Sequence, residues 1–209
     1  FLFIGDGMGF SHVSLTEAYL AQERGVIGND PLTFTQFPVL GLATTYSASN
    51  PITCSSAAGT ALATGTKTKN HMLAVAPDST TKLMSIAYKI HDAGYKVGIM
   101  STVQVNHATP ASFYAHNVDR NNYYEIGKEL PLSGFEFFGG GLLHEKGARK
   151  NLPSLYIDIE NNGYAIARGL DEFKARKSDK MMLTAAERYN EVLPYALGRK
   201  DSDLTLAQM

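Results

Sequence analysis

Cysteine, charge excess and long apolar runs are all scarce in this 209-residue sequence, and each shortage excludes a class of protein. The single cysteine, Cys54, excludes an intrachain disulfide framework. The 19 basic and 20 acidic residues leave a net charge of −1, which gives no electrostatic case for binding nucleic acid or an anionic membrane. No apolar run approaches the roughly 20 residues needed for a membrane span.

What remains is an ordinary globular composition, 44% hydrophobic and 19% charged, with enough residues for a sizeable core. The two ends of the sequence are unusual. The chain starts without Met inside an apolar run, and it closes on residues typical of the first turn of a helix. We therefore expect a fragment of a longer protein, with any signal peptide lying outside it.

Apolar runs alternate with amphipathic or alanine-rich stretches, a pattern typical of an α/β fold with a mostly parallel sheet. We expect strands at 1–4, 38–46, 96–101 and 134–138, and a triple-glycine turn at 139–141. The expected helices cover 11–24, 57–65, 82–93, 112–116, 121–129, 154–161, 170–175 and 185–191.

Polar side chains follow three of the expected strands, where the ligands of open α/β sheets bind. Asp6 lies in a glycine-rich turn, Ser55 opens a small-residue helix, and His107 and Thr109 follow the strand at 96–101, with Arg120 on the next helix. By spacing alone, Asp6 also fits a turn residue, Ser55 a helix cap, His107 a loop histidine and Arg120 a surface charge. Since no HxH, HExxH or paired CxxC motif is present, local spacing does not predict zinc.

Taken together, these segments resemble the alkaline phosphatases. Phe3-Ile-Gly-Asp-Gly-Met-Gly9 is similar to the family's opening motif, and Ile52-Thr-Cys-Ser-Ser-Ala-Ala-Gly-Thr-Ala-Leu-Ala-Thr-Gly65 to its nucleophile loop and helix. Residues 107–111, 115–121 and 137–141 resemble its magnesium, arginine and triple-glycine segments. The resemblance implies a three-layer core, and residues 1–209 would be the amino-terminal part of that single domain, truncated.

Carried over by position, the resemblance implies a phosphate monoester hydrolase with two zinc ions and one magnesium ion. Ser55 would be the nucleophile that becomes a phosphoserine, and Arg120 would hold phosphate oxygens through its planar fork. Asp6 would bridge the second zinc and the magnesium, Ser55 would also be a metal ligand, and Thr109 would bind magnesium with His107 nearby. Phosphate monoesters and inorganic phosphate, a homodimer of the full-length protein, and a periplasmic or secreted location are implied as well.

The sequence departs from the family at Cys54, where an Asp that helps to orient the arginine is usual. We therefore expect looser orientation of Arg120 and weaker phosphate binding. The other metal ligands would follow Met209, and too few remain here to hold zinc firmly, so we expect the fragment to be inactive alone.

Two alternatives stay open. A sulfatase-like hydrolase would use Cys54 as formylglycine, but Ser56 and Ala58 stand where that pattern has proline and arginine. A non-catalytic, phosphate-binding descendant would also fit Cys54 and the truncation. We expect the remaining histidines to be surface or packing residues: His12, His71, His91, His116 and His144.

Overall fold

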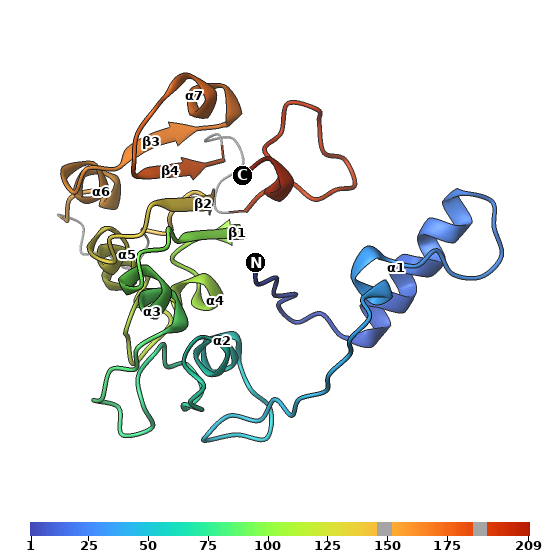
Figure 1. The fold of residues 1–209 in the computed structure, drawn as a ribbon, viewed down its shortest axis with the longest axis horizontal. Helices are drawn as coiled ribbons and strands as arrows, with labels where there is room; N and C mark the ends of the chain where they lie inside the picture. Colours follow the sequence, from blue (N-terminus) through green and yellow to red (C-terminus); the bar gives the residue numbers. More distant parts are fainter. Residues whose placement is uncertain (146–151, 186–191) are drawn as a thin grey trace. The chain divides into compact units, whose positions relative to one another are not determined.

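The computed structural model describes residues 1–145, 152–185 and 192–209, and the chain forms two compact units, Phe1–Thr45 and Tyr46–Met209. Nearly all of the helix expected at 185–191 lies outside the described residues. The elements in chain order are α1 (Phe10–Glu23), η1 (Thr33–Gln36), α2 (Ser55–Thr64), α3 (Ile86–Asp92), β1 (Gly98–Gln104), α4 (Ala108–Ala111), α5 (Tyr123–Leu132), β2 (Phe137–Gly141), α6 (Leu155–Asn161), β3 (Ala165–Arg168), α7 (Leu170–Ala175), β4 (Met181–Thr184) and η3 (Leu206–Gln208) (Figure 1).

The first unit is built on α1, which confirms the helix expected at 11–24. Gly9 precedes the helix, and its N–H donates to Nδ1 of His12, 3.1 Å away. The Glu17 carboxylate ties η1 to α1, because it accepts the Leu32 N–H at 3.0 Å and the Thr35 hydroxyl at 2.7 Å. These two hydrogen bonds lower the pKa of Glu17.

The strands expected at 1–4 and 38–46 were wrong. The structure has no strand within Phe1–Thr45, and most apolar side chains of both runs, among them Phe3 and Leu40, are exposed. An apolar run becomes a strand only when another strand accepts its main-chain hydrogen bonds, and this unit contains none.

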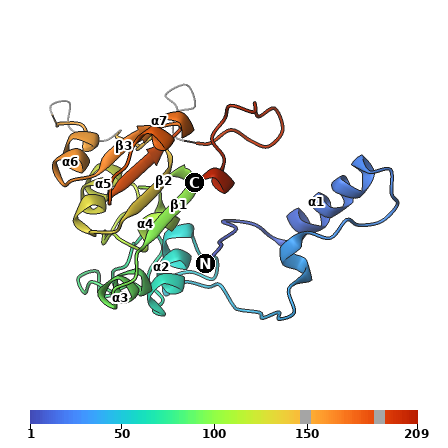
Figure 2. The same ribbon diagram turned by 45° about the horizontal axis from the view of Figure 1, so that its top comes forward.

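The second unit confirms the parallel sheet. Its described strands lie in the order β1-β2-β4-β3, and every neighbouring pair is parallel. Helices α2, α3 and α4 lie toward the β1 edge of the sheet, whereas α7 lies beside β3 (Figures 1 and 2). The carboxyl end of β1 leads directly into α4, the helix that carries Thr109.

Several predicted bounds shift. The triple glycine forms part of β2 rather than a turn, because it pairs with β1 and β4. A Cβ on Gly140 would lie 2.6 Å from the Val103 carbonyl oxygen, so this position has no room for a side chain. The helix expected at 112–116 is instead α4, which ends at Ala111. The helix expected at 82–93 begins only at Ile86, after its cap Ser85. β3 and β4, of four residues each, were not predicted at all.

The main core lies around β2. Phe138 is fully buried, and the ring of Tyr114 meets it edge-on with the centroids 5.4 Å apart. Phe135 and Tyr164 pack against the same ring at 6.3 and 6.1 Å. This aromatic cluster packs around β2 and holds the sheet in place. The sheet in turn positions the carboxyl end of β1, from which the loop with His107 continues.

Candidate active site

Two helices begin with residues predicted for the site. Cys54 precedes α2 in an extended conformation (φ −118°, ψ 168°), and Ser55 is the first residue of that ten-residue helix. His107 precedes α4 in the same way (φ −73°, ψ 161°), and Thr109 is the second residue of α4. Ser55, His107 and Thr109 are each half-buried.

A close contact brings α2 and α4 together. A Cβ placed on Gly59 would lie 2.7 Å from Oγ of Ser112 and 3.5 Å from Cα of Thr109, so only glycine allows the two helices to approach this closely. Ser112 is buried and its hydroxyl donates to the Ala108 carbonyl at 2.8 Å. The helix that carries Ser55 therefore packs directly on the helix that carries Thr109.

The Cys54 thiol makes hydrogen bonds to neighbouring groups of the second unit. Its Sγ accepts the N–H of His71 at 3.1 Å and lies 3.0 Å from the Ser56 hydroxyl. Burial raises the pKa of the thiol, but the hydrogen bonds from His71, Ser56 and Ala57 outweigh it, so the pKa lies below its ordinary value.

Arg120 is fixed at two points. Its main-chain N–H donates to the His71 carbonyl at 2.8 Å, and its Nη2 lies 3.2 Å from Nε2 of His107. Cys54, His71, Arg120 and His107 thus form one continuous series of hydrogen bonds. The structure brings together Ser55, Thr109, His107 and Arg120 on packed or hydrogen-bonded elements of the second unit.

His71 is the residue that sequence reasoning missed. Its side chain is exposed, as expected, but its main chain joins Cys54 to Arg120 in a left-handed conformation (φ 74°). The sequence carries no signal for this role, because main-chain atoms perform it and every residue type except proline has both the N–H and the carbonyl. Of the other histidines, His91 pairs with Glu136 at 3.4 Å and His116 with Glu129 at 3.3 Å.

Asp6 lies in the first unit, exposed, in a turn between Gly5 and Gly7, whose φ is +67°. Only the predicted glycine-rich turn is therefore confirmed. The role of Asp6 as a bridging metal ligand stays a prediction.

The part of the chain that the structure describes holds no complete metal site. Among residues 1–145, 152–185 and 192–209, no three His, Cys, Asp or Glu side chains lie together as a metal would require. The half-buried Ser55 and Thr109 offer hydroxyl oxygens only, so the residues present do not by themselves fit a centre of two zinc ions and one magnesium ion.

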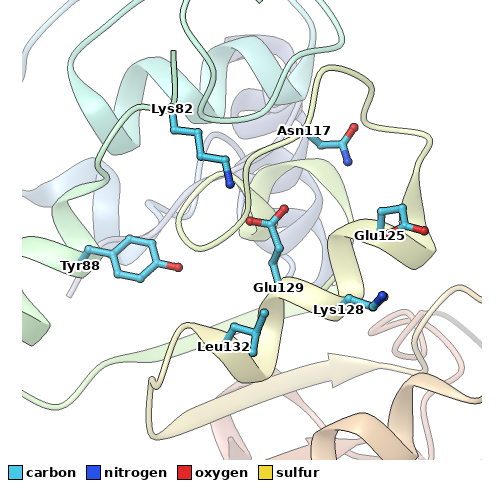
Figure 3. Close-up of a pocket in the computed structure, with 7 residues that line it drawn as sticks. All are labelled: Lys82, Tyr88, Asn117, Glu125, Lys128, Glu129 and Leu132. Atoms are coloured by element: carbon cyan, nitrogen blue, oxygen red, sulfur yellow. The ribbon is translucent and has the colours of Figure 1, made fainter. Parts of the chain in front are cut away.

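A separate cavity of about 530 Å³ lies over α5. Lys82 and Glu129 extend toward each other across it (Figure 3). Glu129 also accepts the N–H of His116 at 3.1 Å, so this carboxylate is already hydrogen-bonded. None of the predicted site residues is in the lining, which consists of Lys82, Tyr88, Asn117, Glu125, Lys128, Glu129 and Leu132.

Solved structures of alkaline phosphatases match this fold. The cold-active alkaline phosphatase of Shewanella sp. aligns with a TM-score of 0.79 at 30% identity, over 95% of this chain and 48% of that chain. The enzyme from the Antarctic bacterium TAB5 aligns with a TM-score of 0.73 at 32% identity, over 87% of this chain and 51% of that chain. Two mutants of the TAB5 enzyme with Mg bound align at 0.76 and 0.78. The α/β fold of this chain is therefore an alkaline-phosphatase-like one.

The sequence comparisons give the same class of hydrolase. A family model described as alkaline phosphatase matches residues 1–136. Alkaline phosphatase 4 of Bacillus subtilis is 37% identical over 191 residues, which is 86% of this chain and 40% of that protein. The chain belongs to the alkaline phosphatase family, and it spans about half or less of the length of these relatives.

Proposed function

We propose that the protein is a phosphate monoester hydrolase in which Ser55 is the nucleophile and Arg120 binds the phosphate. The observation that carries this proposal is the placement of Ser55 as the first residue of α2, in the unit where Arg120 is tied down by hydrogen bonds. A helix N-terminus presents unpaired N–H groups and a positive dipole end, and both attract a phosphate.

The chemistry would proceed in two displacements. The Ser55 hydroxyl gives up its proton as its oxygen bonds to phosphorus, the bond to the alcohol oxygen breaks, and the departing alkoxide takes up a proton. The oxygen of a water molecule then bonds to phosphorus, the bond from phosphorus to the Ser55 oxygen breaks, and that oxygen takes up the proton that water gives up as inorganic phosphate leaves. Arg120 contributes by binding two phosphate oxygens, because the transition state spreads negative charge over the equatorial oxygens and electrostatics with positioning dominate catalysis of this reaction.

The metals belong to a longer protein in this proposal. Asp6, Ser55 and Thr109 would contribute to a centre of two zinc ions and one magnesium ion, with His107 beside the magnesium ligand. The binding of Mg by the TAB5 mutants supports metal dependence, and the shortage of ligands among the described residues supports inactivity of this chain alone.

Location and assembly are proposals of the same kind. In the described ranges, no helix is long and apolar enough to cross a membrane. We propose a periplasmic or secreted homodimer for the full-length protein. A relative from Bombyx mori is named membrane-bound, so attachment to a membrane is the competing arrangement.

The experiment compares the 209-residue chain with the protein encoded when the same gene is read beyond Met209. Both are incubated with zinc and magnesium, and p-nitrophenyl phosphate hydrolysis is measured. We expect turnover in the longer protein, its loss in the matched Ser55→Ala variant, and none above background in the chain alone.

Zinc-dependent turnover by the purified 209-residue chain would refute its inactivity. Phosphate binding without turnover in the longer protein would instead identify a non-catalytic descendant. Sulfate-ester cleavage together with a mass shift on Cys54 would identify the sulfatase-like alternative.

A further inference from the structure

The guanidinium of Arg120 is hydrogen-bonded to the ring of His107. Its Nη2 lies 3.2 Å from Nε2 of His107. An arginine carries five N–H donors and no acceptor, so Nε2 of His107 is the acceptor in this bond and the ring proton is on Nδ1. Within the described residues of the second unit, His107 is the one side chain hydrogen-bonded to this guanidinium.

His107 is itself held firmly. Its N–H donates to the Gln104 carbonyl at 3.0 Å, and its carbonyl accepts the Ala111 N–H at 3.0 Å, which fixes its main chain between β1 and α4. Its ring lies beside that of Tyr123, with the centroids 6.4 Å apart. The buried amide of Asn106 donates to the Tyr123 carbonyl at 3.1 Å and so holds that neighbour in place.

Cys54 does not perform this task in the structure. Its Sγ is occupied by the His71 N–H and the Ser56 hydroxyl. A thiol is also a weak acceptor, whereas a neutral imidazole nitrogen is a good one. Cys54 therefore does not orient Arg120, and a different side chain must do so.

This inference rests on the proposed phosphatase function. We propose that His107 is the positioning residue of Arg120, accepting one N–H of Nη2 and setting the plane of the guanidinium fork. The remaining N–H groups are then directed to phosphate oxygens. Ordering the long arginine side chain before phosphate arrives reduces the entropy lost on binding.

The first test measures the bond itself in the 209-residue chain. At pH 9, where an ordinary imidazole is neutral, long-range ¹H–¹⁵N spectra distinguish the two ring tautomers. We expect the proton of His107 on Nδ1 and slowed rotation of the Arg120 guanidinium, with its signals assigned by comparison with Arg120→Lys. A proton on Nε2 of His107 overturns the proposal, and this measurement needs no folded variant of His107.

The second test uses a matched pair of variants, with guanidinium rotation measured in the 209-residue chain and phosphate affinity in the protein encoded when the same gene is read beyond Met209. In His107→Gln the amide oxygen reaches about as far as Nε2, whereas in His107→Asn it ends near the position of Nδ1. We expect slow guanidinium rotation and unchanged inorganic phosphate affinity in His107→Gln, and free rotation with about 3- to 10-fold weaker phosphate binding in His107→Asn.

The outcomes separate the two proposals. Equal rotation and equal phosphate affinity in the two variants overturn the positioning role. Absence of phosphate binding to the longer protein, with the Nδ1 proton and slow rotation both observed, contradicts the proposed function while confirming that His107 orients Arg120.

Discussion

The contact between α2 and α4 is the most directly testable feature of the fold. Gly59→Ala adds one methyl group to the face of α2 that packs on α4. That carbon would lie 2.7 Å from Oγ and 3.1 Å from Cβ of Ser112. Because Ser112 is fully buried and its hydroxyl is bonded to the Ala108 carbonyl, it cannot simply rotate away. The two helices must separate by several tenths of an ångström.

Two effects oppose each other in this variant. Overpacking a buried contact costs about 1–3 kcal/mol, and the severity of this clash places it in the upper half of that range. Replacing glycine by alanine inside a helix returns about 1 kcal/mol. We therefore expect Gly59→Ala to lower the free energy of unfolding by about 1–2 kcal/mol.

Urea unfolding followed by far-UV circular dichroism measures the change, and a double-mutant cycle with Ser112→Ala assigns its cause. Removing the Ser112 hydroxyl takes away the nearest atom, so we expect the Gly59→Ala penalty to fall by about 1 kcal/mol in that background. A Gly59→Ala protein that gains about 1 kcal/mol, equally in both backgrounds, would refute direct packing of α2 on α4.

Two further predictions concern buried polar groups. Asn106 is fully buried, donates to the carbonyls of Tyr123 and His144 at 3.1 and 3.0 Å, and accepts the His144 N–H at 3.2 Å. Asn106→Ala removes these three buried hydrogen bonds and should cost about 2–4 kcal/mol of unfolding free energy in urea. A loss below 0.5 kcal/mol (roughly the scale of a surface substitution) would contradict a stabilising role for the Asn106 amide. Burial raises the pKa of Tyr88 and Tyr164 to about 12. Since an unfolded tyrosine titrates near pH 10, the folded state keeps its protons longer, and stability present below pH 10 should fall as pH rises from about 10 to 12. Urea unfolding midpoints measured between pH 10 and pH 12 test this loss of stability. We expect a smaller fall of the midpoint in Tyr88→Phe. An unchanged midpoint in the unmodified chain would count against the prediction.

Local sequence patterns were enough to predict several helices, among them α2, α6 and α7. The small-residue run ending in Gly65 predicted α2, and Gly65 indeed ends the helix in the left-handed conformation (φ 73°). The alternation of helical segments with turns likewise predicted α6 and α7. The expected strands at 1–4 and 38–46 failed, since a strand requires main-chain partners from elsewhere in the chain and apolar character does not supply them.

Family membership was determined by the sequence alone, because the motifs around Asp6, Ser55, Thr109 and Arg120 can be recognised without any structure, and the comparisons confirmed it. Tertiary structure decided what holds the site residues of the second unit. Gly59 permits α2 and α4 to touch, the main chain of His71 connects two distant segments, and His107 receives the guanidinium of Arg120. These contacts join residues far apart in sequence through main-chain atoms and close packing, and such contacts exist only once the chain has folded.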